Sequence, residues 1–343
     1  MLTVYSDDHR LQDGQAELMD GRLVPCFEMP RRAFLIREHV LARGLGAILP
    51  PEDLGRGPLE RVHTADFVAF LEHAWDDWRA SGRDHDALPF VWVTRTLRPS
   101  VPERIEGRLG RYSFDAGTPI TAGSWRAAYA SAQVALTAAR LIAGGAQRSA
   151  FALCRPPGHH AAADLYGGYC FLNNVAIAAQ HAIDGGAERV AILDVDYHHG
   201  NGTQAIFYDR PDILFLSLHA DPRQEYPYFL GHADETGSGA GEGCNVNYPL
   251  PWETGFDLWS QALEDACKKI ADWAPDLLLV SLGVDTFKGD PISRFRLESE
   301  DFRRYGARLG QLGLPTLFVM EGGYAVEEVG HNVVNVLEGF EDA

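Results

Sequence analysis

The segment RVAILDVDYHHGNG, residues 189–202, shows in one stretch how the chain is built. Its apolar part, Arg189 to Leu193, has the length and composition of a strand that is buried on both faces of a sheet. The polar part, Asp194 to Gly202, follows directly and carries two aspartates and two histidines. In open α/β sheets, ligands bind beyond the carboxyl ends of the strands. This order of residues therefore predicts a functional strand end.

The same unit recurs along the chain. Further apolar runs of strand length are Ser149–Cys154, Ile213–Leu218, Asp276–Leu282 and Pro315–Met320. Segments with the apolar spacing of helices are Trp125–Ala143, Asn173–Ile183 and Phe256–Trp273. The alternation predicts a single α/β domain over residues 1–343, with an open, doubly wound, mainly parallel sheet flanked by helices. Residues 76–121 interrupt this order and are predicted to form an ordered insertion.

Composition narrows the classes of function. The 343 residues carry a formal net charge of −18, which disfavours binding to nucleic-acid phosphates and favours attraction of small cations. No apolar run approaches the roughly 18 residues of a membrane span. The start, MLTVYSDDHR, does not have the pattern of a secretion signal. A cytoplasmic protein without membrane partners is expected. Its five widely spaced cysteines argue against a disulfide framework.

Polar residues follow each predicted strand. The groups are RPPGHH (Arg155–His160), DVDYHHGNG (Asp194–Gly202), Ser217-Leu218-His219, GVD (Gly283–Asp285) and EGGY (Glu321–Tyr324). Because the carboxyl ends of parallel strands meet at one edge of a sheet, these groups are expected to converge.

Three of the converging residues suit a metal ion. Asp196 and His198 are one residue apart in an extended segment and point the same way, and Asp285 completes a face of two carboxylates and one imidazole. Three protein ligands with an open position are typical of catalytic zinc, although such an oxygen-rich set also accepts Fe(II) or Co(II). Alone, the D-x-H pattern would indicate a turn cap, but Asp285 and the turn at Gly200–Gly202 favour the metal.

Two further groups suit acid–base chemistry. His159 and His160 follow the rigid bend Pro156-Pro157-Gly158, and histidine exchanges protons near neutral pH. Tyr324 follows two glycines whose flexibility allows the phenol to approach the metal as an oxyanion donor.

Taken together, these segments resemble the histone deacetylase superfamily, and in particular its bacterial, class II-like acetylpolyamine amidohydrolase branch. The resemblance is carried by CRPPGHHA (154–161), GGYCFLNN (167–174), ILDVDYHHGNGTQ (192–204), SLGVDTFKGDP (281–291) and MEGGY (320–324). It implies an arginase/deacetylase-like fold with zinc on Asp196, His198 and Asp285. His159 and His160 would be the tandem histidines and Tyr324 the carbonyl-polarising tyrosine.

The resemblance also implies supporting residues. Asp194 and Asn201 would orient the histidines. A structural potassium site would use Asp194, Asp196, His198, Ser217 and Leu218. Substrate-binding positions would be Tyr169 and Tyr226, which wall the acyl-amine tunnel, with Glu17, Glu106 and Gly322. The insertion would form a homodimer and narrow the entrance. Gly117 departs from the family pattern, which has a glutamate there, and leaves Asp115 as another rim carboxylate.

The expected reaction is zinc-dependent hydrolysis of acetylated polyamines or diamines to acetate and free amine. His160 would be the general base, while His159 stabilises charge. Acetyl-lysine proteins or peptides are the alternative substrates. A binuclear manganese ureohydrolase is a rival, but Gly200 stands where a further aspartate ligand would be needed. A non-catalytic acyl-amine binding protein is the other class considered, and the presence of Tyr324 and both histidines argues against it.

Overall fold

The computed structural model describes residues 1–145 and 147–343. Its centre is an eight-stranded sheet in the order β4-β1-β5-β10-β9-β6-β7-β8, and all neighbouring pairs are parallel. The strands are β1 (Leu2–Val4), β4 (Ile48–Leu49), β5 (Ser149–Ala152), β6 (Val190–Asp194), β7 (Ile213–Ala220), β8 (Asn245–Leu250), β9 (Leu277–Leu282) and β10 (Thr316–Met320). A separate antiparallel hairpin joins β2 (Glu17–Met19) to β3 (Arg22–Val24).

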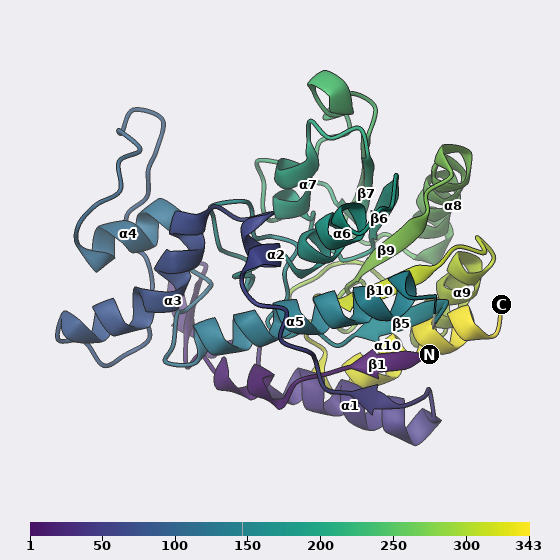
Figure 1. Cartoon of the computed structure of the whole chain (residues 1–343), viewed down its shortest axis with the longest axis horizontal. Helices are drawn as coiled ribbons and strands as arrows, with labels where there is room; N and C mark the ends of the chain where they lie inside the picture. Colours follow the sequence, from purple (N-terminus) through teal and green to yellow (C-terminus); the bar gives the residue numbers. More distant parts are fainter. Residues whose placement is uncertain (146) are drawn as a thin grey trace.

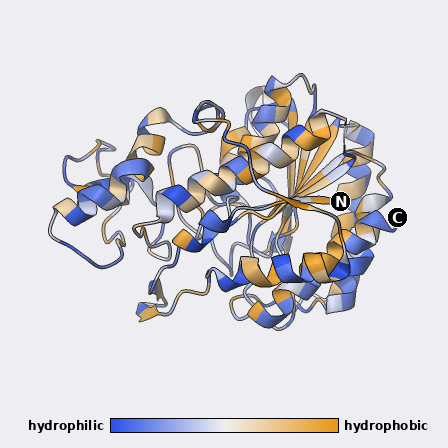
Figure 2. Cartoon of the chain, turned by 60° about the horizontal axis from the view of Figure 1, so that its bottom comes forward, coloured by the Kyte–Doolittle hydropathy of each residue, from blue (hydrophilic) through white to orange (hydrophobic). Residues whose placement is uncertain are grey.

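Helices cover both faces of the sheet (Figure 1). One layer contains α2 (Gly57–Glu60), α3 (Ala65–Ala80), α5 (Ser124–Ala143), α6 (Asn174–Asp184) and α7 (Asn201–Phe207). The other contains α1 (Arg31–Arg43), α8 (Phe256–Trp273), α9 (Ser299–Gly310) and α10 (Val326–Glu341). In Figure 2 the mostly hydrophobic strands lie between these layers. This is the doubly wound arrangement that the sequence predicts.

The apolar composition of the central strands follows from this layering. In β6, Val190 and Ile192 pack into one core, whereas Ala191 and Leu193 pack into the other. Because successive side chains of a strand point to opposite faces, a strand covered on both faces needs apolar residues at every position. Asp194 ends the run and is the first polar residue at the carboxyl edge.

All the predicted strands and helices named above are present, with ends shifted by up to two residues. The sequence reading did not name β1, β4, β8, the β2–β3 hairpin or the helices α1, α3, α9 and α10. Among the described residues, none of the helices is both long and apolar enough to cross a membrane.

The insertion is partly helical. It takes in the end of α3 and contains α4 (Ile105–Tyr112), and the long connection between them projects from the body of the molecule (Figure 1). Two short 3-10 helices, η1 (Asp7–Leu11) and η2 (Gly239–Gly241), complete the fold.

Candidate active site at the carboxyl edge of the sheet

The carboxyl edge of the sheet brings the predicted polar groups together. His159 and His160 follow β5, Asp196 and His198 follow β6, Asp285 follows β9 and Tyr324 follows β10. These strands are neighbours in the sheet, so segments separated by up to 165 residues in sequence meet at one edge.

Three buried side chains form the candidate metal centre. One potential ligand atom from each of Asp196, His198 and Asp285 lies within 4.8 Å of the other two. The His198 Nδ1 atom is 3.1 Å from Asp285 Oδ2. The backbone fixes the carboxylates, because Gly322 N donates to Asp196 Oδ2 and Tyr197 N donates to Asp285 Oδ1. The donor set of two carboxylates and an imidazole is one that zinc accepts.

The negative charge of the two buried carboxylates in this cluster favours a bound cation. Burial and the nearby Asp196 raise the pKa of Asp285 to about 8. The same two carboxylates raise the pKa of His198 to about 10, against the effect of burial. Two buried carboxylates are costly without a positive partner. A divalent metal bound by these ligand atoms would supply that positive charge.

The tandem histidines have different partners. His159 Nδ1 lies 2.9 Å from Asp194 Oδ2, and despite burial its neighbouring carboxylates raise its pKa to about 10. His160 Nδ1 lies 2.6 Å from the amide oxygen of Asn201. Burial and the positive charges of His159 and His198 lower the pKa of His160 well below its usual value. One imidazole is therefore suited to carry charge and the other to accept a proton.

Tyr324 lies near the same centre, close enough for the charges of Asp196 and Asp285 to act on its hydroxyl. Its ring lies 5.5 Å from that of Tyr169, and burial raises the pKa of its hydroxyl well above 10. The phenol therefore stays protonated and can donate a hydrogen bond.

Comparison with known proteins gives a family for the chain. The histone deacetylase domain model matches residues 26–340. The chain belongs to this family.

Within the family, the chain is 63% identical over 341 residues to acetylpolyamine amidohydrolase 2 of Pseudomonas aeruginosa, with 99% of both chains covered. It is 48% identical to the acetylpolyamine amidohydrolase of Mycoplana ramosa, again with 99% of both covered. The crystal structure of acetylpolyamine aminohydrolase from Burkholderia pseudomallei superposes with a TM-score of 0.94 at 39% identity, covering 99% of this chain and 98% of that one. The chain is a histone deacetylase family amidohydrolase of the acetylpolyamine amidohydrolase branch.

The predicted potassium ligands of this deacetylase chain also lie together. Asp194 pairs in register with Ser217 between β6 and β7, next to Leu218. Asp194 Oδ1 accepts from Asp196 N, and the Ser217 hydroxyl is 2.8 Å from His219 Nδ1. Because these side-chain oxygens already have partners, an ion at this position would bind mainly to backbone carbonyl oxygens.

The predicted substrate-binding residues divide into two groups. Tyr169 and Tyr226 lie beside the candidate catalytic groups: the Tyr169 ring lies 5.5 Å from that of Tyr324, and the Tyr226 ring lies 5.2 Å from His160 and 6.0 Å from His198. Glu17 is next to this wall, because its Oε1 accepts from the Tyr169 hydroxyl at 2.8 Å, and burial raises its pKa to about 7.

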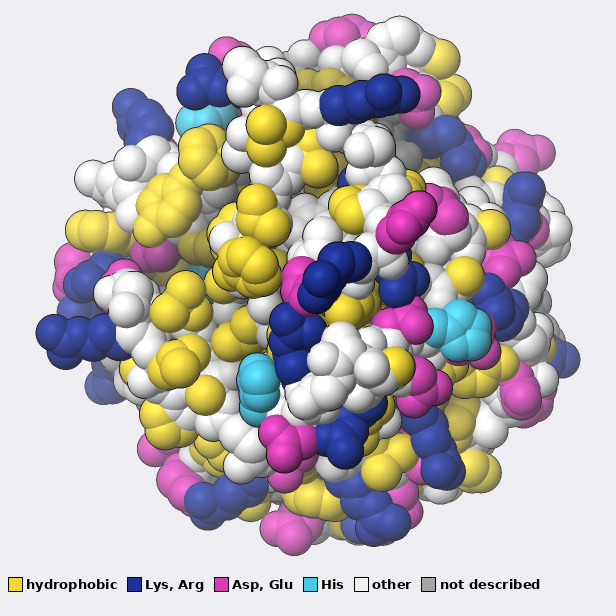
Figure 3. All heavy atoms as spheres, turned by 90° about the vertical axis from the view of Figure 1, so that its left-hand side faces the viewer, with side chains coloured by type: hydrophobic (Ala, Val, Ile, Leu, Met, Phe, Trp, Pro, Cys, Tyr) yellow, Lys and Arg dark blue, Asp and Glu magenta, His cyan; other side chains and the backbone are white. Residues whose placement is uncertain are grey.

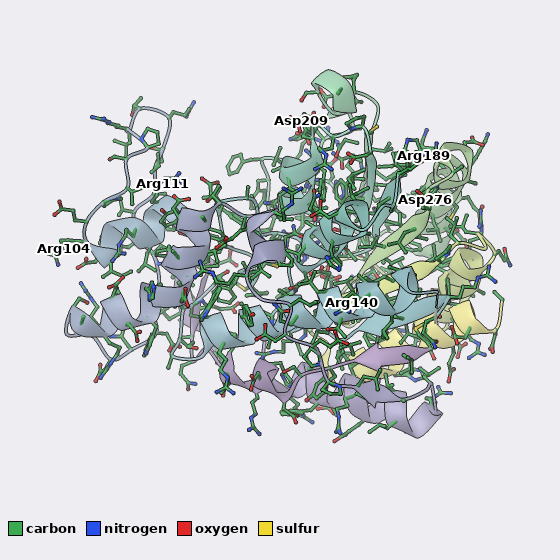
Figure 4. The ribbon with its side chains drawn as sticks, viewed as in Figure 1. Arg104, Arg111, Arg140, Arg189, Asp209 and Asp276 are labelled. Atoms are coloured by element: carbon green, nitrogen blue, oxygen red, sulfur yellow. The ribbon has the colours of Figure 1, made fainter. Side chains whose placement is uncertain are left out.

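Three other predicted rim residues are placed differently. Glu106 lies on α4 and accepts hydrogen bonds from Arg83 and Arg104. Among the described residues, its side-chain hydrogen bonds do not reach the candidate catalytic residues, and Figure 4 shows Arg104 at the outer end of the insertion. Gly322 packs against the metal ligands, since a Cβ there would lie 2.6 Å from Asp196 Oδ2. The Asp115 carboxylate, expected to be a free rim group, already accepts four hydrogen bonds.

Two residues that hold Tyr324 carried no assigned role in the sequence reading. Arg32 is buried, donates to the carbonyls of Gly323 and Glu321 at 2.6 Å, and lies over the Tyr324 ring at 4.7 Å. Asp290 accepts from Tyr324 N at 2.6 Å. Asp290 lies in the quoted segment 281–291, whereas Arg32 lies outside the quoted segments, and neither residue has a spacing typical of a ligand.

Proposed function

We propose that this chain hydrolyses acetylated polyamines and diamines to acetate and free amine, with one zinc ion per chain. The observation that carries the proposal is the three-ligand cluster of Asp196, His198 and Asp285, which adjoins the tandem histidines and Tyr324. When bound, zinc would polarise the acetyl carbonyl as a Lewis acid and lower the pKa of the attacking water. The ligand set also accepts Fe(II) or Co(II).

His160 is the general base in this proposal. Its Nδ1 faces the Asn201 amide oxygen, so its proton belongs on Nδ1 and the Nε2 lone pair is free to accept. Its low pKa keeps it neutral. It takes a proton from the attacking water and then delivers that proton to the departing amine nitrogen.

His159 and Tyr324 stabilise charge. Asp194 holds His159 as an imidazolium, which places positive charge beside the reacting carbonyl. Tyr324 donates its phenol proton in a hydrogen bond to the oxyanion that develops on the acetyl oxygen. Arg32 donates to the Gly323 carbonyl before Tyr324, and Asp290 accepts from Ala325 N after it, so the donor is preorganised.

The substrate class rests on two supports. The relatives with 62–63% identity are named acetylpolyamine amidohydrolases, and the net charge of −18 attracts cationic amines. Acetyl-lysine peptides are the alternative substrates. A binuclear manganese site is disfavoured because a side chain at Gly200 would lie 2.2 Å from Asp194 Oδ2, so the position has no room for a further ligand.

The proposal includes a homodimer formed through the insertion. Its connection exposes five large apolar side chains: Phe90, Val91, Val93, Leu97 and Val101, at 40% to 70% of their areas. Figure 3 views this end of the molecule, and hydrophobic side chains gather on it. Large contiguous apolar patches of this kind mark interfaces. A second copy of the chain is the proposed partner, and a cytoplasmic location and a structural potassium ion complete the proposal.

The test is a deacetylation panel with metal analysis. The wild-type chain, loaded with zinc, is compared on acetylated diamines, longer acetylpolyamines and acetyl-lysine peptides. The expected order places the small cationic amides first. The highest kcat/KM on histone-tail peptides, with acetylpolyamines barely turned over, would overturn the substrate assignment. Two tightly bound manganese ions per chain would overturn the mononuclear site.

A further inference from the structure

One carboxylate of the insertion connects the two tyrosines of the tunnel. The Tyr226 hydroxyl donates to Asp115 Oδ2 at 2.8 Å. Gly168 N donates to the same oxygen at 2.7 Å, next to Tyr169. Asp115 therefore joins the segment after β7 to the segment after β5, which come from different parts of the sheet edge.

The second oxygen completes the connection. Asp115 Oδ1 accepts from Gly117 N and from the Thr118 hydroxyl, each at 3.2 Å. The Thr118 oxygen in turn accepts from Tyr169 N at 2.9 Å. An ionised carboxylate offers about four acceptor positions, and four donors occupy them here. The Asp115 carboxylate therefore has its acceptor positions filled by groups of the protein itself.

Both tyrosines, Tyr169 and Tyr226, contact groups that the proposed mechanism uses. Tyr226 contacts His160 and His198, and Tyr169 contacts Tyr324. At Gly168, φ is +57°, and a Cβ would lie 2.2 Å from His160 Cδ2. The backbone that Asp115 holds is thus in direct contact with the general base.

We propose that Asp115 is a positioning residue that fixes Tyr226 and the Gly168-Tyr169 segment against His160 and Tyr324, and so sets the fit of the tunnel to the linear amide substrate. Asp115 acts by positioning Tyr226 and the Gly168-Tyr169 segment, and not by binding the distal ammonium of the substrate. The inference rests on the proposed function, because it concerns how the same site positions its substrate.

The test is a double-mutant cycle with Asp115→Asn, Tyr226→Phe and the double variant. Each is assayed on an N-acetylated diamine and on an N-acetylated alkylamine of equal chain length without a charge. Asparagine keeps the shape but leaves two donors without an acceptor, so kcat/KM falls about 30-fold, because small misplacements at a reacting centre are costly. Tyr226→Phe loses about fivefold, and the double variant stays within about twofold of Asp115→Asn, since partners in one network are not additive.

In Asp115→Asn, kcat/KM is expected to fall by the same factor for the charged and the neutral amide. Part of this fall is expected in kcat. Thermal stability and zinc content are measured for every variant. Tyr226→Phe keeps the ring and serves as the test if Asp115→Asn folds poorly. Crystal structures of the variants provide a readout without turnover, in which the Tyr226 ring is expected to move away from His160.

The matched control pair is Asp53 and Tyr129. The Tyr129 hydroxyl donates to Asp53, which also accepts from Gly55 N, so the chemistry is the same outside the active site. Asp53→Asn and Tyr129→Phe are expected to change kcat/KM by less than about twofold, as for a surface hydrogen bond.

Two results would overturn the inference. A loss confined to the charged amide would make Asp115 an ammonium-binding residue. Additive effects, with the Tyr226 ring unmoved in Asp115→Asn, would remove the positioning role. A wild-type chain that turns over neither amide would instead refute the proposed function, and the ring position would still decide the inference.

Discussion

The candidate catalytic edge and the outer part of the insertion, around Glu106, use charge in opposite ways. At the edge, charged side chains from distant parts of the sequence are buried and share hydrogen bonds with backbone that the sheet has already fixed. In the insertion, Glu106 and its arginines form local pairs near the surface, and apolar side chains are exposed. The comparison teaches that the parallel sheet determines the chemistry, whereas a segment outside the sheet adjusts access and fit.

The sharpest test of this contrast compares aspartates at the two ends of β9. Asp285→Ala removes a metal ligand and should lower kcat/KM by about a thousandfold or more, roughly 4 kcal/mol of barrier. Bound zinc should be lost together with activity. Asp276, labelled in Figure 4, precedes the strand and caps backbone amides of Glu188 and Arg189. Asp276→Ala should retain zinc and near-normal turnover, and a matching loss there would show a general effect on the fold.

The next effect concerns the oxyanion donor. Tyr324→Phe should lower kcat by at least about a hundredfold while the zinc content is unchanged, since only a hydrogen-bond donor is removed. Arg32 would still donate to the Gly323 carbonyl before residue 324, and Asp290 would still accept from Ala325 N after it. Steady-state kinetics with elemental analysis decide the point, and near-normal turnover would exclude Tyr324 as the polarising group.

A smaller effect is expected on the pH dependence of stability. It comes from Glu17, which lies where the carboxyl edge of the sheet meets the β2–β3 hairpin. Its pKa is about 7 in the folded chain against 4.5 for the ordinary group. Between these values the folded chain holds a proton that the unfolded chain has released, so stability should fall as pH rises from 4.5 to 7.

Glu17→Gln should lack this decline and be more stable than wild type at pH 8, by on the order of 1 kcal/mol. Urea midpoints of both proteins from pH 5 to pH 8 test it. Parallel curves for the two proteins would mean that Glu17 is not the responsible group.

The smallest effect belongs to the insertion. Because two arginines already neutralise Glu106, Glu106→Gln should lower kcat/KM for acetylpolyamines by only about two- to threefold more than for a neutral acetylated amine, as surface pairs contribute little. Raising the ionic strength should remove the difference. A loss above about tenfold would contradict this view and would indicate that a second copy brings Glu106 to the tunnel.

The sequence by itself determined five neighbouring strands of the sheet (β5, β10, β9, β6 and β7), their carboxyl edge and the cluster of Asp196, His198 and Asp285 at that edge. Strands buried on both faces need uninterrupted apolar runs, and parallel strands bring their carboxyl ends together, so both features are local patterns with one geometric consequence. Only the tertiary structure decided what Asp115, Glu106 and Arg32 do. Their partners come from segments that have no fixed spacing in the sequence. The sequence pattern around a charged residue is the same whether its side chain contacts solvent, an arginine or a backbone carbonyl, so its partner cannot be predicted from that pattern.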